Sequence, residues 1–377
     1  MIFFFRIFLS FVFIILLTSC NDNDTQNVTP PNISELEAIA QNNPNAPQWV
    51  ANDNIKSRNG DAMGYGVILN PDSDKVLIFL DGGGACFNQI TCNANLDSYS
   101  EGDFNSRFQN ESALIISTSA NNQFAGWNVV FVPYATGDVH SGANTMANVP
   151  NGGPSNQKMV GYNNVHVIFN ELKTYFDNNS GLSEIVLSGA SAGGYGTLLN
   201  TIQLANIFGT TTPTTVINDS GPIFTDQDIL TNCLATHWTN LWLLDQNMPT
   251  DLDTVVQNSY NFNIQKIYDY LALKYPNFNF GLLSTYGDQV IRSFYSFGKD
   301  NCAPVPSSLI TGTEFKNELL DLKQNVLDNH SNWKVFYTNG TGHTFLGSST
   351  LGQSVNGVTL NQWIQDLRAG SALDLME

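Results

Sequence analysis

The fold is decided by residues 183–195, which read SEIVLSGASAGGY. The apolar run at 184–187 predicts a buried strand, and residues 195–207 continue with the composition of a helix. Between them, residues 189–193 (GASAG) fit the pattern G-x-S-x-G. Such a strand-to-helix turn strains the serine backbone and leaves room only for small neighbours. The context predicts that Ser191 is a nucleophile raised above a sheet at a helix N-terminus, the alternative being a purely structural glycine-rich turn.

Short apolar runs alternate with helix-length segments along the rest of the chain. Strands are expected at 63–69, 75–80, 127–132, 183–187, 214–217, 280–284 and 334–337, and helices at 159–176, 195–207 and 360–367. This alternation and the serine turn predict an α/β-hydrolase fold, with a mostly parallel central sheet flanked by helices. Residues 222–280 are irregular and rich in aromatic side chains, so we expect a cap-like insertion. Its aromatics either face a substrate or pack an extra helical layer.

A second glycine run, residues 81–86 (DGGGAC), follows the expected strand at 75–80. In α/β-hydrolases this loop supplies backbone donors to the oxyanion of the tetrahedral intermediate, and glycine lets the backbone approach the substrate carbonyl. We expect the donors to be the amides of Gly83, Gly84 and Ala192. A phosphate-binding loop fits poorly, because no Lys and Ser/Thr follow at the required spacing.

The general base and its acid partner should follow the serine, because chain order in this fold is serine, acid, histidine. His343 lies in a glycine-flanked loop after the last expected strand and is the predicted base. Position favours Asp288, one strand earlier, as the acid and leaves Asp219 as the alternative, although Asp219 also suits a turn or a helix cap. The other histidines lie at less suitable places: His140 before the serine, His166 in a helix, His237 on the insertion and His330 before the last strand.

Four cysteines remain once Cys20 is assigned to the N-terminal signal. An even number in an exported protein suggests two disulfides, with three possible pairings. Cys86 and Cys92 are close in sequence and form a plausible local bridge, which would leave Cys233 to pair with Cys302. A metal site is the alternative, but the paired short spacings of zinc sites are absent from the sequence.

The N-terminus reads as a targeting segment. Arg6 precedes a short apolar run at 7–17, and residues 17–20 (LTSC) have the order of a bacterial lipoprotein signal with Cys20 lipidated. An ordinary secretory signal is the alternative. We expect a signal peptide at 1–20, a flexible tether at 21–35, a hydrolase domain at 36–377 and an exported, envelope-anchored lipoprotein. The net charge of −18 argues against a nucleic-acid partner.

Several segments after residue 60 resemble the pectin acetylesterase family, which includes the carboxylesterase Notum. They are 81–88 (DGGGACFN) with Cys92 behind it, 133–142 (PYATGDVHSG), 161–164 (GYNN) and 190–194 (ASAGG). Residues 218–221 (NDSG) are similar to a family segment that lacks the catalytic acid, whereas 281–289 (GLLSTYGDQ) are similar to the one that carries it. The resemblance therefore implies that Asp288 is the acid, and that Cys86 and Cys92 form the family's short disulfide.

The family resemblance implies a serine ester hydrolase that removes O-acetyl groups from a polysaccharide such as pectin, with no metal or cofactor. The family's aromatic residue in the oxyanion loop is replaced here by Gly84 or Ala85, which we expect to open the acyl pocket. The net charge of −18 makes a polygalacturonate backbone an awkward partner. Neutral acetylated glycans and lipid, acyl-protein or polyester esters therefore stay open, as does a non-catalytic surface binding protein on a hydrolase scaffold.

Overall fold

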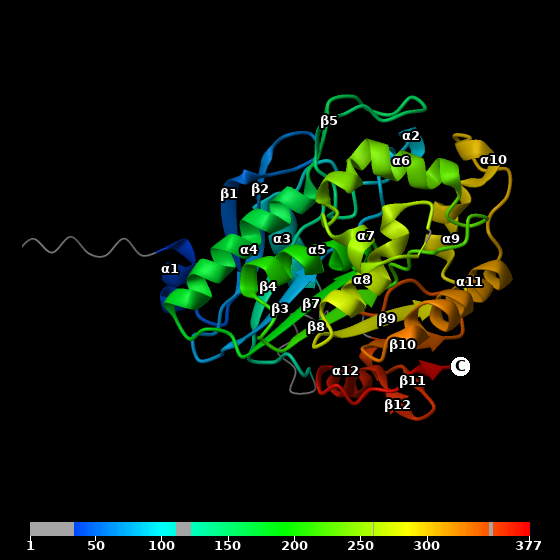
Figure 1. The fold of residues 1–377 in the computed structure, drawn as a ribbon. Coiled ribbons are helices and arrows are strands. Elements are labelled where there is room, and N and C mark those ends of the chain that lie inside the picture. The colour runs from blue at the N-terminus through cyan, green and yellow to red at the C-terminus, as the bar shows by residue number, and fades with distance from the viewer. Residues whose placement is uncertain (1–33, 111–121, 259, 347–349) are drawn as a thin grey trace, which may run out of the picture. The chain divides into compact units, whose positions relative to one another are not determined.

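A nine-stranded sheet organises the part of the chain that the computed structural model describes, residues 34–110, 122–258, 260–346 and 350–377 (Figure 1). These residues belong to one unit, Ser34–Glu377. The predicted signal peptide with Cys20, and all but the end of the predicted tether, lie outside the described residues. No helix in the described ranges is long and apolar enough to cross a membrane.

The strand order is β1-β2-β4-β3-β7-β8-β9-β10-β13. The first two strands are antiparallel to their neighbours, and all pairs from β4 to β13 are parallel. The sheet is therefore mostly parallel, as predicted, and the likeness to solved structures described below confirms the fold class. The bounds are β1 (Gln48–Lys56), β2 (Ala62–Ile68), β3 (Lys75–Leu80), β4 (Asn128–Val132), β7 (Glu184–Ala190), β8 (Thr214–Asp219), β9 (Asn279–Thr285), β10 (Trp333–Thr338) and β13 (Leu375–Met376).

Helices cover both faces of this sheet. The strand registers place Gly66 of β2 and Gly281 of β9 on the same face. A Cβ on Gly66 would lie 2.1 Å from Phe104 of α3 (Glu101–Asn110), and one on Gly281 would lie 2.6 Å from Leu367 of α12 (Leu360–Arg368). Both helices therefore pack closely on that face. Helices α4 (Gly161–Asn178), α5 (Ala192–Phe208) and α8 (Ile267–Lys274) lie on the other (Figure 1).

The remaining elements are short or peripheral. They are α1 (Glu35–Asn42), α2 (Gln89–Asn93), β5 (Asn144–Ala147), β6 (Gln157–Met159), α6 (Asn232–Trp242), η1 (Leu244–Asn247), α7 (Leu252–Val255), η2 (Asn263–Lys266), α9 (Gln289–Ser296), α10 (Lys299–Cys302), α11 (Gly312–Asn325), η3 (Leu327–Asn329), η4 (Thr350–Gly352), β11 (Ser354–Val355) and β12 (Val358–Thr359). Disulfides join Cys86 to Cys92 and Cys233 to Cys302, which confirms the predicted pairing.

The insertion at 222–280 folds into α6, α7, α8 and two short 3-10 helices. Its aromatic side chains lie in two settings. Trp238 and Trp242 of α6 line a pocket, described below. Buried packing is the role of four others, Phe224, Tyr268, Tyr270 and Tyr275.

The carboxyl ends of the parallel strands meet at one edge of the sheet, where ligands bind in open α/β folds. β3, β7, β9 and β10 all end there. The loops after these strands carry, in turn, the predicted oxyanion donors, Ser191, Asp288 and His343. The topology thus brings residues that are far apart in sequence to one side of the molecule.

Candidate active site

Ser191 occupies the sharp turn between β7 and α5. Its backbone has φ 58° and ψ −119°, a conformation that non-glycine residues rarely adopt and that costs about 1–3 kcal/mol. Two backbone hydrogen bonds hold the turn: the Ser191 N–H donates to the Asp219 carbonyl at 2.8 Å, and the Tyr195 N–H donates to the Ser191 carbonyl at 3.1 Å. The strained conformation is therefore held by hydrogen bonds to the end of β8 and to the first turn of α5.

Glycine is required on both sides of this turn. A Cβ on Gly189 would lie 2.3 Å from the carbonyl oxygen of Gly193, and a Cβ on Gly193 would lie 1.9 Å from that of Leu80. Both distances are far below contact distance, so β7, β3 and the start of α5 could not approach so closely with larger residues. The pattern G-x-S-x-G has a steric cause in this chain.

Asp288 and His343 form a hydrogen-bonded pair. His343 Nδ1 lies 2.8 Å from Asp288 Oδ2, and the Asp288 side chain is fully buried. The other carboxylate oxygen, Oδ1, accepts hydrogen bonds from the backbone N–H groups of Val290 and Ile291, both at 3.0 Å, at the start of α9. Because a carboxylate only accepts, Nδ1 is the donor, and Nε2 of the neutral ring is left as an acceptor.

The loop that carries His343 is fastened to the loop that carries Asp288. The Gly287 N–H donates to the Gly340 carbonyl at 2.9 Å, and the Thr285 hydroxyl donates to the Gly342 carbonyl at 2.6 Å. The backbone just before His343 is therefore hydrogen-bonded to the last residue of β9 and to the segment that follows it.

Asp219 anchors the other side of the same loop. Its Oδ2 accepts hydrogen bonds from the N–H groups of Phe345 and Leu346, each at 2.7 Å, and its Oδ1 accepts one from the Ser220 hydroxyl at 2.9 Å. Burial raises the pKa of the Asp219 carboxyl to about 6, because the surroundings disfavour its charged form. The structure thus places the carboxylate of Asp219 on backbone amides, and it places Asp288 against the imidazole.

The oxyanion loop after β3 packs directly on the serine turn. A Cβ on Gly82 would lie 2.8 Å from the Ala190 carbonyl and 3.1 Å from Ser191 Cβ. Of the three predicted donors, Gly84 and Ala192 border the same pocket as Ser191. Gly83 is not among the described residues that line it. Two of the three residues predicted to supply donor amides therefore line the pocket that Ser191 borders.

A pocket opens at Ser191. Its walls come from the oxyanion loop, from α5, from α6 and from α9. Trp238 and Trp242 stack with ring centroids 5.6 Å apart. The lining residues are Gly84, Ala85, Val139, Ser141, Ser191, Ala192, Tyr195, Leu199, Ile223, Trp238, Trp242, Leu244, Ile264, Ile291 and Phe294. The walls are predominantly apolar and suit an acyl chain or another apolar group.

Ala85 and Gly84 stand where the resemblance predicted an aromatic side chain, and both line the pocket. A Cβ on Gly84 would lie 3.0 Å from Cζ of Phe294. An aromatic ring from α9 thus lies beside the place that a larger residue would fill. Sequence reasoning missed Phe294, Ile291 and Tyr195 as lining residues, and the only signal was their position a few residues after Asp288 or Ser191.

Of the other four histidines, three form hydrogen bonds with groups other than Ser191 and Asp288. His140 is buried, which lowers the pKa of its imidazole to about 4. One group of side chains in the described residues could approach metal geometry, Cys233, His237 and Cys302, but the two sulfurs are joined in a disulfide. The remaining contacts are His140 Nε2 with the Asp81 carbonyl at 2.8 Å, His166 Nδ1 with Gln203 Oε1 at 3.2 Å, and His330 Nε2 with Asp269 Oδ1 at 2.6 Å.

Comparison with known proteins finds a matching family and several relatives of this chain. The family model described as pectinacetylesterase matches residues 64–366. Palmitoleoyl-protein carboxylesterase NOTUM of Mus musculus is 28% identical over 160 residues, which are 41% of this chain and 30% of that protein. The Homo sapiens protein of the same name is 29% identical over 161 residues, again 41% and 30%. The alignment thus spans less than a third of these relatives' length.

The fold is similar to a solved structure. The Wnt deacylase Notum from Drosophila superposes with a TM-score of 0.59 at 21% identity, over 88% of this chain and 95% of that chain. This likeness shows that the two chains share the fold, including the large sheet and its flanking helices.

Proposed function

Because the chain belongs to the pectinacetylesterase family, a family of carboxylic ester hydrolases, we propose that it hydrolyses esters by Ser-His-Asp acyl transfer. In this proposal Ser191 is the nucleophile, His343 the base and Asp288 the acid that orients it. One observation carries the proposal. A strained serine turn borders an apolar pocket, on the same sheet edge as a hydrogen-bonded Asp288–His343 pair.

The reaction runs in two steps. Nε2 of His343 takes the Ser191 hydroxyl proton as Oγ bonds to the acyl carbon, and the carbonyl oxygen becomes the oxyanion, held by the amides of Gly84 and Ala192. Collapse breaks the bond to the alcohol, which leaves with the proton from His343. Water then attacks the acyl-serine, gives its proton to His343 and releases the carboxylic acid as Ser191 regains a proton. Asp288 stabilises the imidazolium that forms in each step.

We propose acetylated polysaccharide as the first substrate class, because the matched family is described by acetyl removal from pectin. The net charge of −18 favours regions of a polymer whose own charge is masked by esterification, or neutral acetylated glycans.

A second candidate is an ester of a longer acyl chain, on a lipid, a protein or a polyester. The lining favours this candidate, because the walls of the pocket at Ser191 are predominantly apolar. The curated relatives are named for palmitoleoyl-protein. Both candidates use the same chemistry and differ in the acyl group that the pocket receives.

The activity is tested with purified protein and its Ser191→Ala variant. We expect labelling of the protein by a fluorophosphonate, loss of that label in the variant, and loss of at least about 10³-fold in kcat on activated esters. Full hydrolysis by the variant would refute the proposal, and absence of labelling would favour a non-catalytic binding protein. A series from acetyl to palmitoyl on one leaving group, run beside acetylated pectin and xylan, separates the two substrate classes.

We also propose that the protein works outside the cytoplasm. Two disulfides in the described residues are typical of an oxidising compartment. Lipid anchoring through Cys20 stays a prediction, and mass spectrometry of the mature N-terminus tests it: an unmodified Cys20, or a mature chain that begins at another residue, would refute the anchor.

A further inference from the structure

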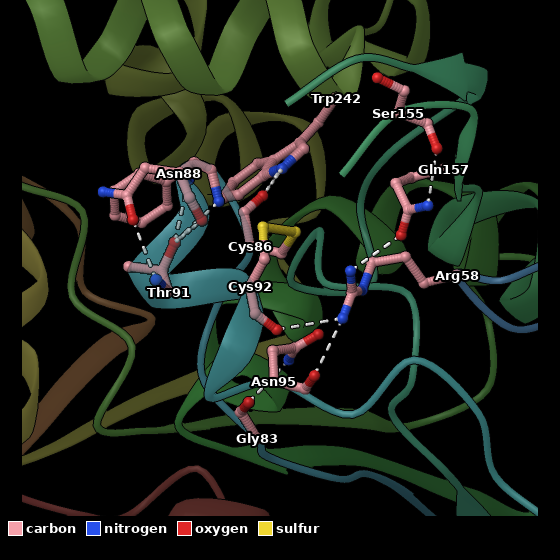
Figure 2. The surroundings of a disulfide bond; sticks show 11 residues. Arg58, Gly83, Cys86, Asn88, Thr91, Cys92, Asn95, Ser155, Gln157 and Trp242 are labelled. Atoms are coloured by element: carbon pink, nitrogen blue, oxygen red, sulfur yellow. Dashed lines mark hydrogen bonds between the residues drawn. A yellow bond between two sulfur atoms is a disulfide. The ribbon is translucent and has the colours of Figure 1, made fainter. Parts of the chain in front are cut away.

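We propose that Asn95 is a positioning residue for the oxyanion hole, an inference that rests on the proposed function. The Asn95 side-chain amide donates a hydrogen bond of 2.7 Å to the carbonyl oxygen of Gly83 (Figure 2). The Gly83–Gly84 peptide is trans, so its N–H, which belongs to Gly84, points away from Asn95. Gly84 borders the pocket beside Ser191, so this hydrogen bond holds its N–H in a donor orientation.

The peptide between Gly83 and Gly84 depends on such a restraint because neither residue has a side chain. Their φ angles are +154° and +81°, and glycine adopts positive and negative φ with similar ease. A flip of this peptide would turn the Gly83 carbonyl, an acceptor, toward the place where the oxyanion forms. The hydrogen bond from Asn95 favours the orientation in which a donor faces that place.

Asn95 itself is held firmly. The residue is 6% exposed, its backbone N–H donates to the Cys92 carbonyl at 3.2 Å, and its carbonyl accepts from Arg58 at 2.9 Å. The Arg58 guanidinium also donates to the Cys92 carbonyl at 3.1 Å and to Gln157 Oε1 at 2.8 Å (Figure 2). The disulfide from Cys92 to Cys86 returns this segment to the end of the oxyanion loop. The donor therefore sits on a rigid support tied to the loop it positions.

A second side chain holds the beginning of the same loop. His140 Nε2 lies 2.8 Å from the Asp81 carbonyl, which can only accept, so the ring donates. The N–H of Gly82 points the opposite way in that peptide. Side chains from two separate segments thus fix the first and third peptides of the loop. Their N–H groups belong to Gly82 and Gly84, and of these two residues only Gly84 lines the pocket.

The test compares Asn95→Ala and Asn95→Leu, which lack the donor, with Asn93→Ala, the same truncation at an exposed residue two positions earlier. Active sites are counted by end-point titration with a fluorophosphonate, so that unfolded protein does not contribute. For both Asn95 variants we expect kcat per titrated site to fall about 10- to 100-fold with KM within about 3-fold. A trifluoromethyl ketone, whose adduct with Ser191 places an oxyanion in the hole, should bind weaker by the same factor.

The outcomes are distinct. Fewer titrated sites with unchanged kcat per site would show that Asn95 only stabilises the fold, and would overturn the inference. An unchanged affinity for the ketone, or an equal fall of kcat in Asn93→Ala, would overturn it too. If hydrolysis by the wild-type protein does not depend on Ser191, the proposed function fails and this inference fails with it. Ser191-dependent hydrolysis with wild-type kcat in both Asn95 variants refutes the inference alone.

Discussion

Replacing Asp219 with asparagine should make the stability of the protein less sensitive to pH. Asn keeps the shape of Asp, its oxygen can accept from both N–H groups that Oδ2 accepts now, and its amide can donate to the Ser220 hydroxyl. What changes is the charge. Burial raises the pKa of Asp219 from 3.8 to about 6, a shift of about 2 units, or roughly 3 kcal/mol at about 1.4 kcal/mol per unit.

The direction of this pH effect depends on whether the folded or the unfolded state binds the proton of Asp219 more tightly. The folded pKa is the higher one, so this group's contribution to stability is fully present below pH 3.8 and is lost as the pH rises through about 6. Asp219→Asn has no such loss. We therefore expect the variant and the wild-type protein to have similar free energies of unfolding near pH 4, and the variant to be more stable by about 3 kcal/mol at pH 7.

Urea unfolding of both proteins across this pH range measures the difference, because other titrating groups are common to both. Asp219→Ala is the matched control: it removes the charge and also leaves the amides of Phe345 and Leu346 without their acceptor, at a cost of about 1–3 kcal/mol each. A gap between wild type and Asp219→Asn that stays constant with pH would refute the reasoning.

Three further predictions concern the acid, the pocket and the loop disulfide. Asp288→Asn should lower kcat by about 10³- to 10⁴-fold, because an amide can donate to Nδ1 and favour the wrong tautomer; a loss below about 10-fold in steady-state kinetics would contradict its role. Ile264→Phe should lower kcat/KM for long acyl esters by about 10-fold or more and leave acetyl esters nearly unchanged, which the acyl series measures; equal effects on both would contradict an acyl pocket. The double variant Cys86→Ser with Cys92→Ser should lose about 2 kcal/mol in the free energy of unfolding, measured in urea, because this disulfide closes a short loop of sequence separation 6. An unchanged unfolding midpoint would contradict this.

Much of the fold was predictable because local patterns carried it. The strand predicted at 75–80 is β3, with both bounds correct, because every residue after Lys75 is apolar and buried. The edge strand β1 was missed. It pairs on one side only and reads QWVANDNIK, in which few residues are buried, so neither alternation nor an apolar run marks it.

The site was predictable only in part. Ser191, Asp288 and His343 could be proposed because each follows a recognisable strand and chain order restricts the choice. Asp219 looked like a turn residue, because nothing near it in sequence indicates its two amide partners. These lie 126 and 127 positions further along the chain. Asn95 had no local signal at all, because its contact depends on how the backbone at Gly83 is placed in space. Roles that act through the backbone of another loop leave no pattern in the sequence around the residue itself.

The stacked pair on α6 also gives the protein an optical reporter. Of its six tryptophans, Trp238 and Trp242 both line the pocket at Ser191. An acyl chain that enters this space changes the polarity around two indole rings at once, and indole emission depends on polarity. Intrinsic fluorescence should therefore follow ligand entry in real time without a label, and in the Ser191→Ala variant it should give the affinity for an intact ester with no turnover to obscure it.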